Sequence, residues 1–236
     1  MARWQIDQPI PMGSMDKTDK QELLIDIFSD VVCPWCFIGK RQLESALQAL
    51  AQEQPELKIT VRWLPYFLNP DAPEEGDPYR PFLEKKFGGA AAVDALLARV
   101  QAAALGIGLE LALDKITLRG NTLNAHRLIH RFQQRGNADA VVEKLFAAHF
   151  QRGEFIGDKA LLVKIAVECG DEAEAVAAYL DSSEDSIVVL EQARRAQKAG
   201  ISGVPFFIFN GKQALSGAQP AQEILQNIRQ ALALNS

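Results

Sequence analysis

The sequence predicts an α/β protein in which a long helical segment separates the two halves of one sheet. Strand patterns are confined to residues 23–63 and 205–216, near the two ends of the chain. Between them, a block of roughly 120 residues shows helical periodicity. Neither end holds enough strands for a complete sheet. We therefore expect the two ends to pair in one discontinuous domain with a helical insertion.

The N-terminal end predicts a βαβ unit. Residues 23–28 form a short apolar run that fits a strand buried on both faces. Apolar residues then recur at helical spacing from Pro34, which suits the first helical position, to about residue 54. Pro55 ends this helix, and residues 57–63 alternate apolar and polar side chains as a strand does. The unit implies a parallel strand pair with a right-handed crossover.

The middle of the chain predicts helices after a connection at residues 66–80, which is rich in proline and acidic residues. Asn121 and Thr122 can cap the third helix, and Gly200 is a plausible stop after the last one. The helices are expected at residues 79–87, 90–105, 122–135, 138–150, 158–169, 171–181 and 184–199. The apolar residues 109–113 do not decide between helix and strand.

Strand signals return near the C-terminus. Residues 205–209 form an apolar strand, and Asn210-Gly211 is a strong hairpin signal. Residues 212–216 then form the returning strand, and residues 219–233 show the apolar spacing of a helix.

These elements define the predicted domains. Residues 21–66 and 200–236 form the discontinuous domain, and residues 67–199 form the inserted helical domain. Residues 1–20 are treated as an N-terminal extension, because Gly13-Ser14-Met15 resembles a cloning junction followed by a natural start.

Composition excludes several functional classes. Of the 236 residues, 48% are hydrophobic and 23% are charged, as in ordinary globular proteins. Lys and Arg number 25 against 30 Asp and Glu, so a net charge of −5 favours neither a nucleic-acid nor a membrane partner. No run approaches the ~18 apolar residues of a membrane span, and the N-terminus lacks a secretory signal pattern. We therefore expect a soluble, cytoplasmic protein.

Cys33 and Cys36 form a Cys-Pro-Trp-Cys motif at the start of the first predicted helix. Positions i and i+3 share a helix face, which places the two Cα atoms near the ~5.5 Å that a disulfide prefers. The helix N-terminus favours a thiolate at Cys33, whereas Cys36 lies one turn deeper. We expect Cys33 to be the attacking thiol and Cys36 the resolving thiol.

Two other interpretations of this motif are open. Zinc would need two further ligands, and the remaining cysteine, Cys169, has no partner nearby in the sequence. We therefore expect no metal, and we expect Cys169 to be a buried core thiol. An inert cysteine pair is the second alternative. Three cysteines also do not suit a secreted, disulfide-stapled protein.

Val204-Pro205 stands at the start of the apolar strand of residues 205–209. Proline cannot donate to the ladder there, so backbone groups of Val204 stay free to pair with an extended peptide. A cis bond would turn those groups toward the two cysteines, whereas an ordinary trans proline is the common alternative.

Two titratable positions are weaker candidates. Asp26 lies in the first strand, where a carboxylate desolvated beneath the cysteines could accept a proton from Cys36. Its alternative is a partly wet strand face. His126 and His130 are four residues apart, which suits a metal site, proton transfer or a solvated helix face.

Four segments resemble one family. Residues 26–41, with the Cys-Pro-Trp-Cys motif, resemble the active-site segment of the DsbA-like thioredoxin-fold family, in particular its FrnE-type cytoplasmic branch. Residues 203–207 are similar to its cis-proline loop, residues 121–128 to a motif of its helical domain, and residues 155–158 to a weaker motif. The resemblance spans about residues 22–230. It implies a thioredoxin-like fold with an inserted helical domain, as the element order does independently.

The resemblance also implies roles. Cys33 corresponds to the nucleophile, Cys36 to the resolving cysteine and Pro205 to the cis-proline of the family. Trp35 occupies the variable dipeptide that tunes redox potential, where DsbA itself has histidine. Together with Val204 and Pro205, Trp35 is expected to bind substrate, and His126 is expected to face the cleft.

The expected function is thiol–disulfide exchange with protein or small-molecule substrates. No cofactor is expected beyond a redox-active disulfide, with glutathione as a potential co-substrate. One alternative is a glutathione-dependent transferase or isomerase, of the kappa-class or 2-hydroxychromene-2-carboxylate isomerase type, although those proteins generally carry serine at the position of Cys33. Another alternative is a non-catalytic binding module. Monomer and homodimer are both open.

Overall fold

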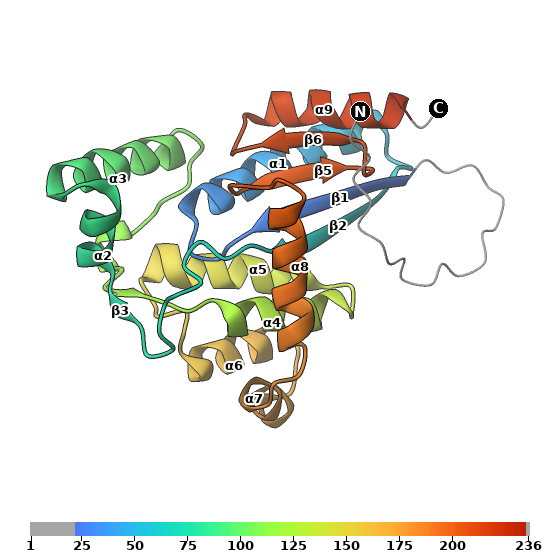
Figure 1. Ribbon diagram of the computed structural model, residues 1–236. Coiled ribbons are helices and arrows are strands. Elements are labelled where there is room, and N and C mark those ends of the chain that lie inside the picture. Colours follow the sequence, from blue (N-terminus) through green and yellow to red (C-terminus); the bar gives the residue numbers. More distant parts are fainter. Residues whose placement is uncertain (1–21, 235–236) are drawn as a thin grey trace.

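A four-stranded sheet, in the order β2-β1-β5-β6, forms the centre of the computed structural model, which describes residues 22–234 (Figure 1). β1 (Glu22–Ser29) pairs in parallel with β2 (Lys58–Pro65). It pairs antiparallel with β5 (Phe206–Phe209), which in turn pairs antiparallel with β6 (Gln213–Ser216). Both ends of the chain therefore share one sheet, as predicted. The predicted extension of residues 1–20 lies outside the described residues.

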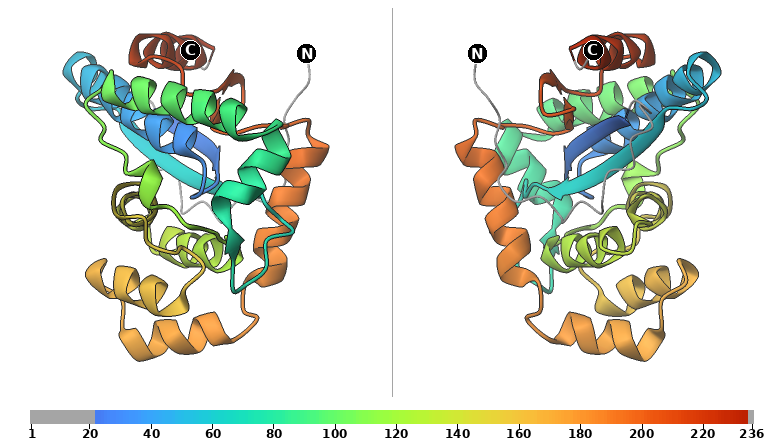
Figure 2. Two further views of the ribbon diagram at one scale, coloured as in Figure 1. Left: turned by 90° about the vertical axis from the view of Figure 1, so that its left-hand side faces the viewer. Right: turned by 90° about the vertical axis from the view of Figure 1, so that its right-hand side faces the viewer.

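Two helices cover one face of the sheet and a third crosses the other (Figures 1 and 2). α1 (Pro34–Glu53) and α9 (Ala221–Ala233) pack side by side on the first face. α8 (Ser186–Lys198) crosses the opposite face. Because side chains alternate along a strand, Ile25 and Ile27 join the core beneath α1, whereas Phe28 joins a separate cluster that includes Ala196 of α8.

The helix α1 forms where the sequence predicts it. Pro34 occupies the first turn, where a missing N–H costs nothing. Leu43, Ala46 and Leu50 are buried at spacings of three and four residues, which fits one apolar helix face against the sheet. The helix ends at Glu53, shortly before Pro55. This element and its boundaries are confirmed.

The C-terminal hairpin is confirmed as well. Asn210 and Gly211 have φ values of 50° and 65°, and this left-handed conformation suits the tight three-residue loop between Phe209 and Gln213. The Asn210 side-chain oxygen also accepts a hydrogen bond from the Leu24 amide at 2.7 Å. The turn therefore both joins β5 to β6 and anchors the hairpin to β1.

Seven helices lie between β2 and β5 and match the predicted ones to within about two residues, except at the end of the fourth. They are α2 (Tyr79–Phe87), α3 (Ala90–Leu105), α4 (Leu123–Gln133), α5 (Ala138–Phe146), α6 (Lys159–Glu168), α7 (Ala173–Asp181) and α8. α5 passes directly into a π-helical turn, Ala147–Gln151. A 3₁₀ turn, Leu113–Lys115, occupies the end of the stretch that the sequence left undecided.

The segment is not entirely helical. β3 (Asp77–Pro78) pairs antiparallel with β4 (Leu118–Arg119), and the Arg119 guanidinium holds the pair through two hydrogen bonds to Asp77 at 2.7 and 2.6 Å. A strand of two residues leaves no alternation to detect in a sequence, so this pair was missed. Residues 67–199 remain the proposed extent of the insertion.

α4 and α5 pack against β2, and α6 and α7 lie beyond them, whereas α2 and α3 form an arm at the end of the sheet (Figure 2). Within residues 22–234, no single helix is long and apolar enough to cross a membrane. Only the pair α2 and α3 reaches that length and composition, and it is bent by 103°.

Candidate active site

Cys33 and Cys36 lie at the junction between β1 and α1. Cys33 is the residue directly before the helix, and its amide donates a hydrogen bond to the Asp30 carbonyl at 3.0 Å. The Cys36 amide donates to the Cys33 carbonyl at 3.0 Å, which closes the first turn. Both thiols are free and are not bonded to each other. The unpaired amides and the dipole of a helix N-terminus favour negative charge at the position of Cys33.

The two thiols differ in their surroundings. Cys33 is 5% exposed and Cys36 only 1%. Burial raises the pKa of the Cys36 thiol well above its ordinary value, and a negative charge on Cys33 raises it further. The Ser29 hydroxyl and the Asp30 backbone lower this pKa but do not cancel the burial. Cys36 therefore holds its proton at neutral pH unless a neighbouring group removes it.

The Val204-Pro205 segment lies directly against Cys33. The Cys33 thiol donates a hydrogen bond to the Val204 carbonyl at 3.7 Å, and the Val204–Pro205 peptide bond is cis. On its other side the proline ring packs on α1, where a Cβ added to Gly39 would lie 2.8 Å from Pro205 Cγ. The structure thus brings together three of the residues singled out from the sequence.

This contact makes Gly39 a sensitive position. Gly39→Ala would place a methyl group within 2.8 Å of Pro205 and 3.4 Å of the Phe207 ring, so the proline loop must move away from α1. Alanine favours a helix over glycine by about 1 kcal/mol, which offsets part of the strain. We expect a near-normal melting temperature but a roughly tenfold loss of turnover, since misplaced groups cost rate more than stability.

Gly106→Ala is the matched control. Gly106 also has a helical backbone, and its added Cβ would meet only backbone oxygens at 3.4 Å or more. Equal turnover of the two variants would show that the contact between Gly39 and Pro205 does not hold the loop in place.

Tyr79 is a site residue that the sequence did not reveal. Burial and the charge of Cys33 raise the pKa of Tyr79 to about 12, so the hydroxyl keeps its proton beside Cys33. Its ring packs against the same core cluster as Cys33 and Trp35. Tyr79 is the first residue of α2, and only the tertiary fold returns this helix to the end of β1. No local pattern could therefore have marked it.

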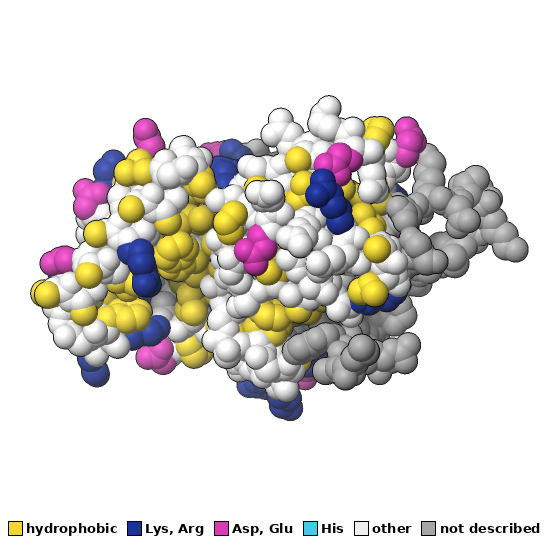
Figure 3. All heavy atoms as spheres, turned by 90° about the horizontal axis from the view of Figure 1, so that it is seen from above, with side chains coloured by type: hydrophobic (Ala, Val, Ile, Leu, Met, Phe, Trp, Pro, Cys, Tyr) yellow, Lys and Arg dark blue, Asp and Glu magenta, His cyan; other side chains and the backbone are white. Residues whose placement is uncertain are grey.

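Trp35 is half-buried and packs against the main core cluster. The Arg99 guanidinium of α3 lies 5.9 Å from its ring. Figure 3 shows hydrophobic side chains lining the hollow between the arm formed by α2 and α3, at left, and the rest of the molecule. The arm therefore meets the Cys-Pro-Trp-Cys motif through the contact between Arg99 and Trp35.

Asp26 does not lie where the proton-transfer hypothesis needs it. Its carboxylate accepts two hydrogen bonds from Arg62, its register partner on β2, at 2.6 and 2.7 Å. It also shares its strand face with Phe28, opposite the face that Ile25 and Ile27 present to the core with Cys36. The assignment of proton transfer to Asp26 is therefore wrong, because the carboxylate is paired on the other side of the sheet.

His126 is not a surface residue of the cleft. It is 4% exposed, and its Nε2 atom lies 3.2 Å from the Tyr66 carbonyl and 3.4 Å from Asp30 Oδ1. Contact between His126 and a substrate stays a prediction, because no substrate-bound geometry tests it. His130 lies apart from His126, 3.9 Å from Asp185. Among residues 22–234, no group of three His, Cys, Asp or Glu side chains could hold a metal ion.

Cys169 caps the end of α6 and is only partly buried, rather than fully enclosed as predicted. Its thiol packs against the edge of the main core cluster, and burial raises its pKa. No disulfide joins it to another described cysteine.

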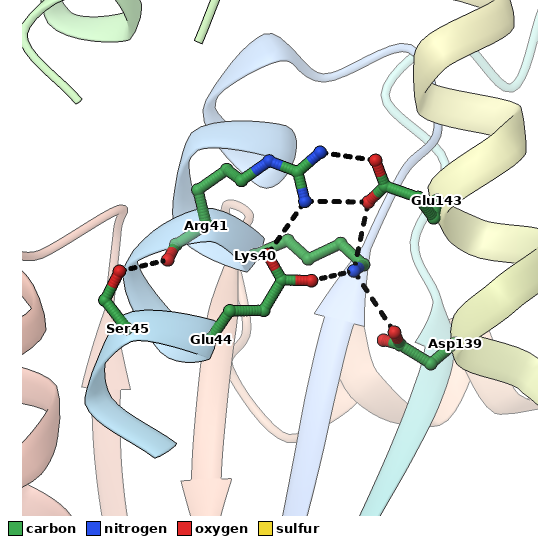
Figure 4. Close-up of polar contacts among 6 residues, drawn as sticks. All are labelled: Lys40, Arg41, Glu44, Ser45, Asp139 and Glu143. Carbon is green, nitrogen blue, oxygen red and sulfur yellow. Dashed lines mark hydrogen bonds and ion pairs between the residues drawn. The ribbon is translucent and has the colours of Figure 1, made fainter. Parts of the chain in front are cut away.

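A cluster of charges ties the cysteine-bearing helix to α5 (Figure 4). Lys40 is 2% exposed and contacts Glu44, Asp139 and Glu143, the last two at 3.2 and 3.1 Å. Burial alone would lower the pKa of Lys40, but these acidic partners raise it above its usual value. Arg41 adds a forked pair to Glu143. The cluster therefore fixes the orientation of α1 against the helical segment.

This sheet order, with a Cys-x-x-Cys pair at the N-terminus of its first helix, defines a protein of the thioredoxin fold. The chain belongs to the DSBA-like thioredoxin domain family, which matches residues 24–229.

Several known proteins are similar to it. A probable DsbA oxidoreductase from Streptomyces coelicolor is 30% identical, with a TM-score of 0.78 over 89% of this chain and 90% of that one. An uncharacterized protein of Bacillus subtilis, YwbO, is 26% identical over 82% of this chain and 90% of its own length.

More distant structures share the fold. A 2-hydroxychromene-2-carboxylate isomerase is 18% identical, with a TM-score of 0.66 over 90% of this chain and 97% of that one. The cytosolic disulfide reductase DsbM from Pseudomonas aeruginosa, solved with glutathione, is also 18% identical, with a TM-score of 0.57 over 90% of this chain and 96% of that one.

Proposed function

We propose that the protein is a thiol–disulfide oxidoreductase whose chemistry is carried by Cys33 and Cys36. The Cys33 thiolate attacks a substrate disulfide, forms a mixed disulfide and releases the first substrate thiolate. Cys36 then loses its proton and attacks the Cys33 sulfur, which forms the Cys33–Cys36 disulfide and releases the second substrate thiolate. The same steps in reverse oxidise a substrate dithiol.

The observation that carries this proposal is the asymmetry of the two thiols. Cys33 stands at a helix N-terminus against the Val204 carbonyl, whereas Cys36 is enclosed one turn deeper with a raised pKa. An attacking thiol needs access and thiolate character, whereas a resolving thiol need only reach the first sulfur. Membership of the DSBA-like family supports the same division of roles.

The proposed substrates are proteins or small molecules that carry a thiol or a disulfide. Val204 and Pro205 offer a backbone edge beside Cys33, and the half-buried Trp35 packs against the core cluster that contains Cys33. Recognition by backbone groups suits extended peptides of varied sequence. Glutathione is a proposed co-substrate. The proposal also includes a cytoplasmic location and membership of the FrnE-type branch. It leaves both a monomer and a homodimer open.

The alternatives fit less well. A glutathione-dependent isomerase is one alternative, and its support is that the solved 2-hydroxychromene-2-carboxylate isomerase has the same fold. Such a mechanism needs no second thiol, however, and here Cys36 is buried directly behind Cys33. A non-catalytic binding module would need neither cysteine.

Redox titration tests the function. Equilibration with graded ratios of reduced to oxidised glutathione, followed by alkylation and mass spectrometry, should give one two-electron transition between dithiol and intramolecular disulfide. The transition should be the same in Cys169→Ala, because Cys169 lies on α6 and takes no part. Absence of a Cys33–Cys36 disulfide at every ratio would contradict the proposal.

A further inference from the structure

A carboxyl group lies fully buried beneath the cysteine turn. Asp30 has no exposed surface, and its backbone contacts both Cys33 and Cys36. Its Oδ2 atom accepts a hydrogen bond from the Leu68 amide at 2.8 Å, but Oδ1 has no hydrogen-bond partner among the described residues. A buried carboxylate oxygen is costly to leave unpaired, so this atom requires an explanation.

The imidazole of His126 faces that unpaired oxygen. Its Nε2 atom lies 3.4 Å from Asp30 Oδ1, and the ring is held edge-on against Phe67 with the two centroids 4.9 Å apart. A carboxylate and an imidazole at this separation can share one proton, because a small movement of the imidazole ring or of the carboxylate brings the two groups into a hydrogen bond.

One small cavity lies between Ser29 and His126. It has a volume of about 10 Å³, room for about one water molecule, and Ser29, Trp63 and His126 line it together with apolar side chains. The Trp63 indole N–H has no partner among the described residues. The Ser29 hydroxyl lies close enough to the Cys36 thiol to lower its pKa. Polar groups thus follow one another from Cys36 through Ser29 and the cavity to His126 and Asp30.

We propose that Asp30 and His126 accept the proton that Cys36 loses when it resolves the mixed disulfide, with Ser29 and a water in the cavity as the path. In that step the Cys36–Cys33 bond forms, the bond between Cys33 and the substrate sulfur breaks, and the substrate leaves as a thiolate. The proton stays on the Asp30–His126 pair, and it returns to Cys36 when the disulfide is reduced again. This inference rests on the proposed function.

The other titratable groups around the pair do not replace it. Cys33 and Cys36 face Asp30 from α1, and His149 faces it from the π-helical turn. Burial lowers the pKa of His149 to about 4, although the charge of Asp30 opposes this shift, so His149 is neutral throughout the working range. Burial also raises the pKa of Cys36, so the thiol needs a proton acceptor at neutral pH.

The test separates the two thiols in one reaction. Reduced protein, with Cys169 replaced by alanine, is mixed with one equivalent of the disulfide dithiobis(nitrobenzoate). Attack by Cys33 releases a first coloured thiolate, and attack by Cys36 on the mixed disulfide releases a second. Asp30→Asn and His126→Gln should keep the first phase within about threefold and slow the second about 10²-fold at pH 7. The deficit should shrink above about pH 10, where hydroxide removes the proton directly.

Two variants serve as controls. Asp26→Asn removes a buried carboxylate of β1 that is paired with Arg62, and His130→Gln removes an imidazole one turn further along α4. Both should leave the two phases unchanged. If Asp30→Asn fails to fold, His126→Gln and His126→Phe decide the result.

The outcomes are distinct. A second phase equal to that of the parent protein in the Asp30 and His126 variants overturns the proton-transfer role. A second phase slowed equally at every pH also overturns it, since that marks a purely structural effect. If the parent protein itself releases no second thiolate, the proposed function fails together with this inference.

Discussion

Replacing Cys33 with serine is expected to abolish thiol–disulfide exchange, with a loss on the order of 10³-fold or more. A serine hydroxyl does not ionise in the working range, so the helix N-terminus has no nucleophile left to stabilise. The measurement is the rate of insulin disulfide reduction with excess dithiol. Serine keeps a donor for the Val204 carbonyl, so the fold should be unchanged in circular dichroism.

Cys36→Ser should behave differently. Cys33 still attacks, but the mixed disulfide is no longer resolved from within and accumulates as a covalent adduct that mass spectrometry detects. Cys169→Ser is the control for loss of a thiol as such and should keep full activity. Substantial activity of Cys33→Ser in the presence of glutathione would instead support the transferase or isomerase alternative, in which the thiol of bound glutathione does the chemistry.

The fold could be predicted because its strands and helices carry their own periodicity. The run before the cysteines, the helix between Pro34 and Pro55, and the turn at Asn210-Gly211 are each decided within a few residues. Short-range rules of this kind also place Cys33 and Cys36 in one helical turn. They fail for β3 and β4, whose pairing depends on the long-range contact between Asp77 and Arg119.

The surroundings of the thiols could not be predicted in the same way. Asp26 and Asp30 are four residues apart in one segment, and no sequence pattern tells which carboxylate is paired with an arginine. Strand register decides that Arg62 neutralises Asp26. The packing of α4 decides that His126 meets Asp30. The resemblance to a family predicts His126 in the cleft, and the structure buries it beside Asp30.

The neighbouring residue, Arg127, should show the largest effect on stability. It is 2% exposed, and its guanidinium donates to the Asn124 side chain at 2.7 Å and to the carbonyls of Tyr179, Leu180 and Glu184 at 2.6, 3.2 and 2.8 Å. These bonds join α4 to the end of α7 and to the turn before α8. The partially negative end of α7 offsets the buried charge.

Arg127→Ala removes all four hydrogen bonds. It also leaves a large cavity, because Arg127 is among the largest fully buried side chains of the described residues. Large-to-small substitutions in a core cost about 2–5 kcal/mol, and each buried acceptor deprived of its donor adds to that cost. We expect a loss of about 4 kcal/mol in the free energy of unfolding, seen as a melting temperature lower by roughly 10 °C. Arg127→Lys keeps the charge but not the forked geometry, and should lose about half as much.

Arg131→Ala is the matched control, one turn further along α4. Arg131 also lies over the Tyr179 ring, at 5.0 Å, but its partner Asp171 keeps a second guanidinium, that of Arg135 at 2.9 Å. Because Asp171 stays paired, the expected cost is only about 1 kcal/mol. Equal losses for Arg127 and Arg131 would show that the hydrogen bonds to the carbonyls contribute little, and that general packing of α4 sets the stability of the helical segment.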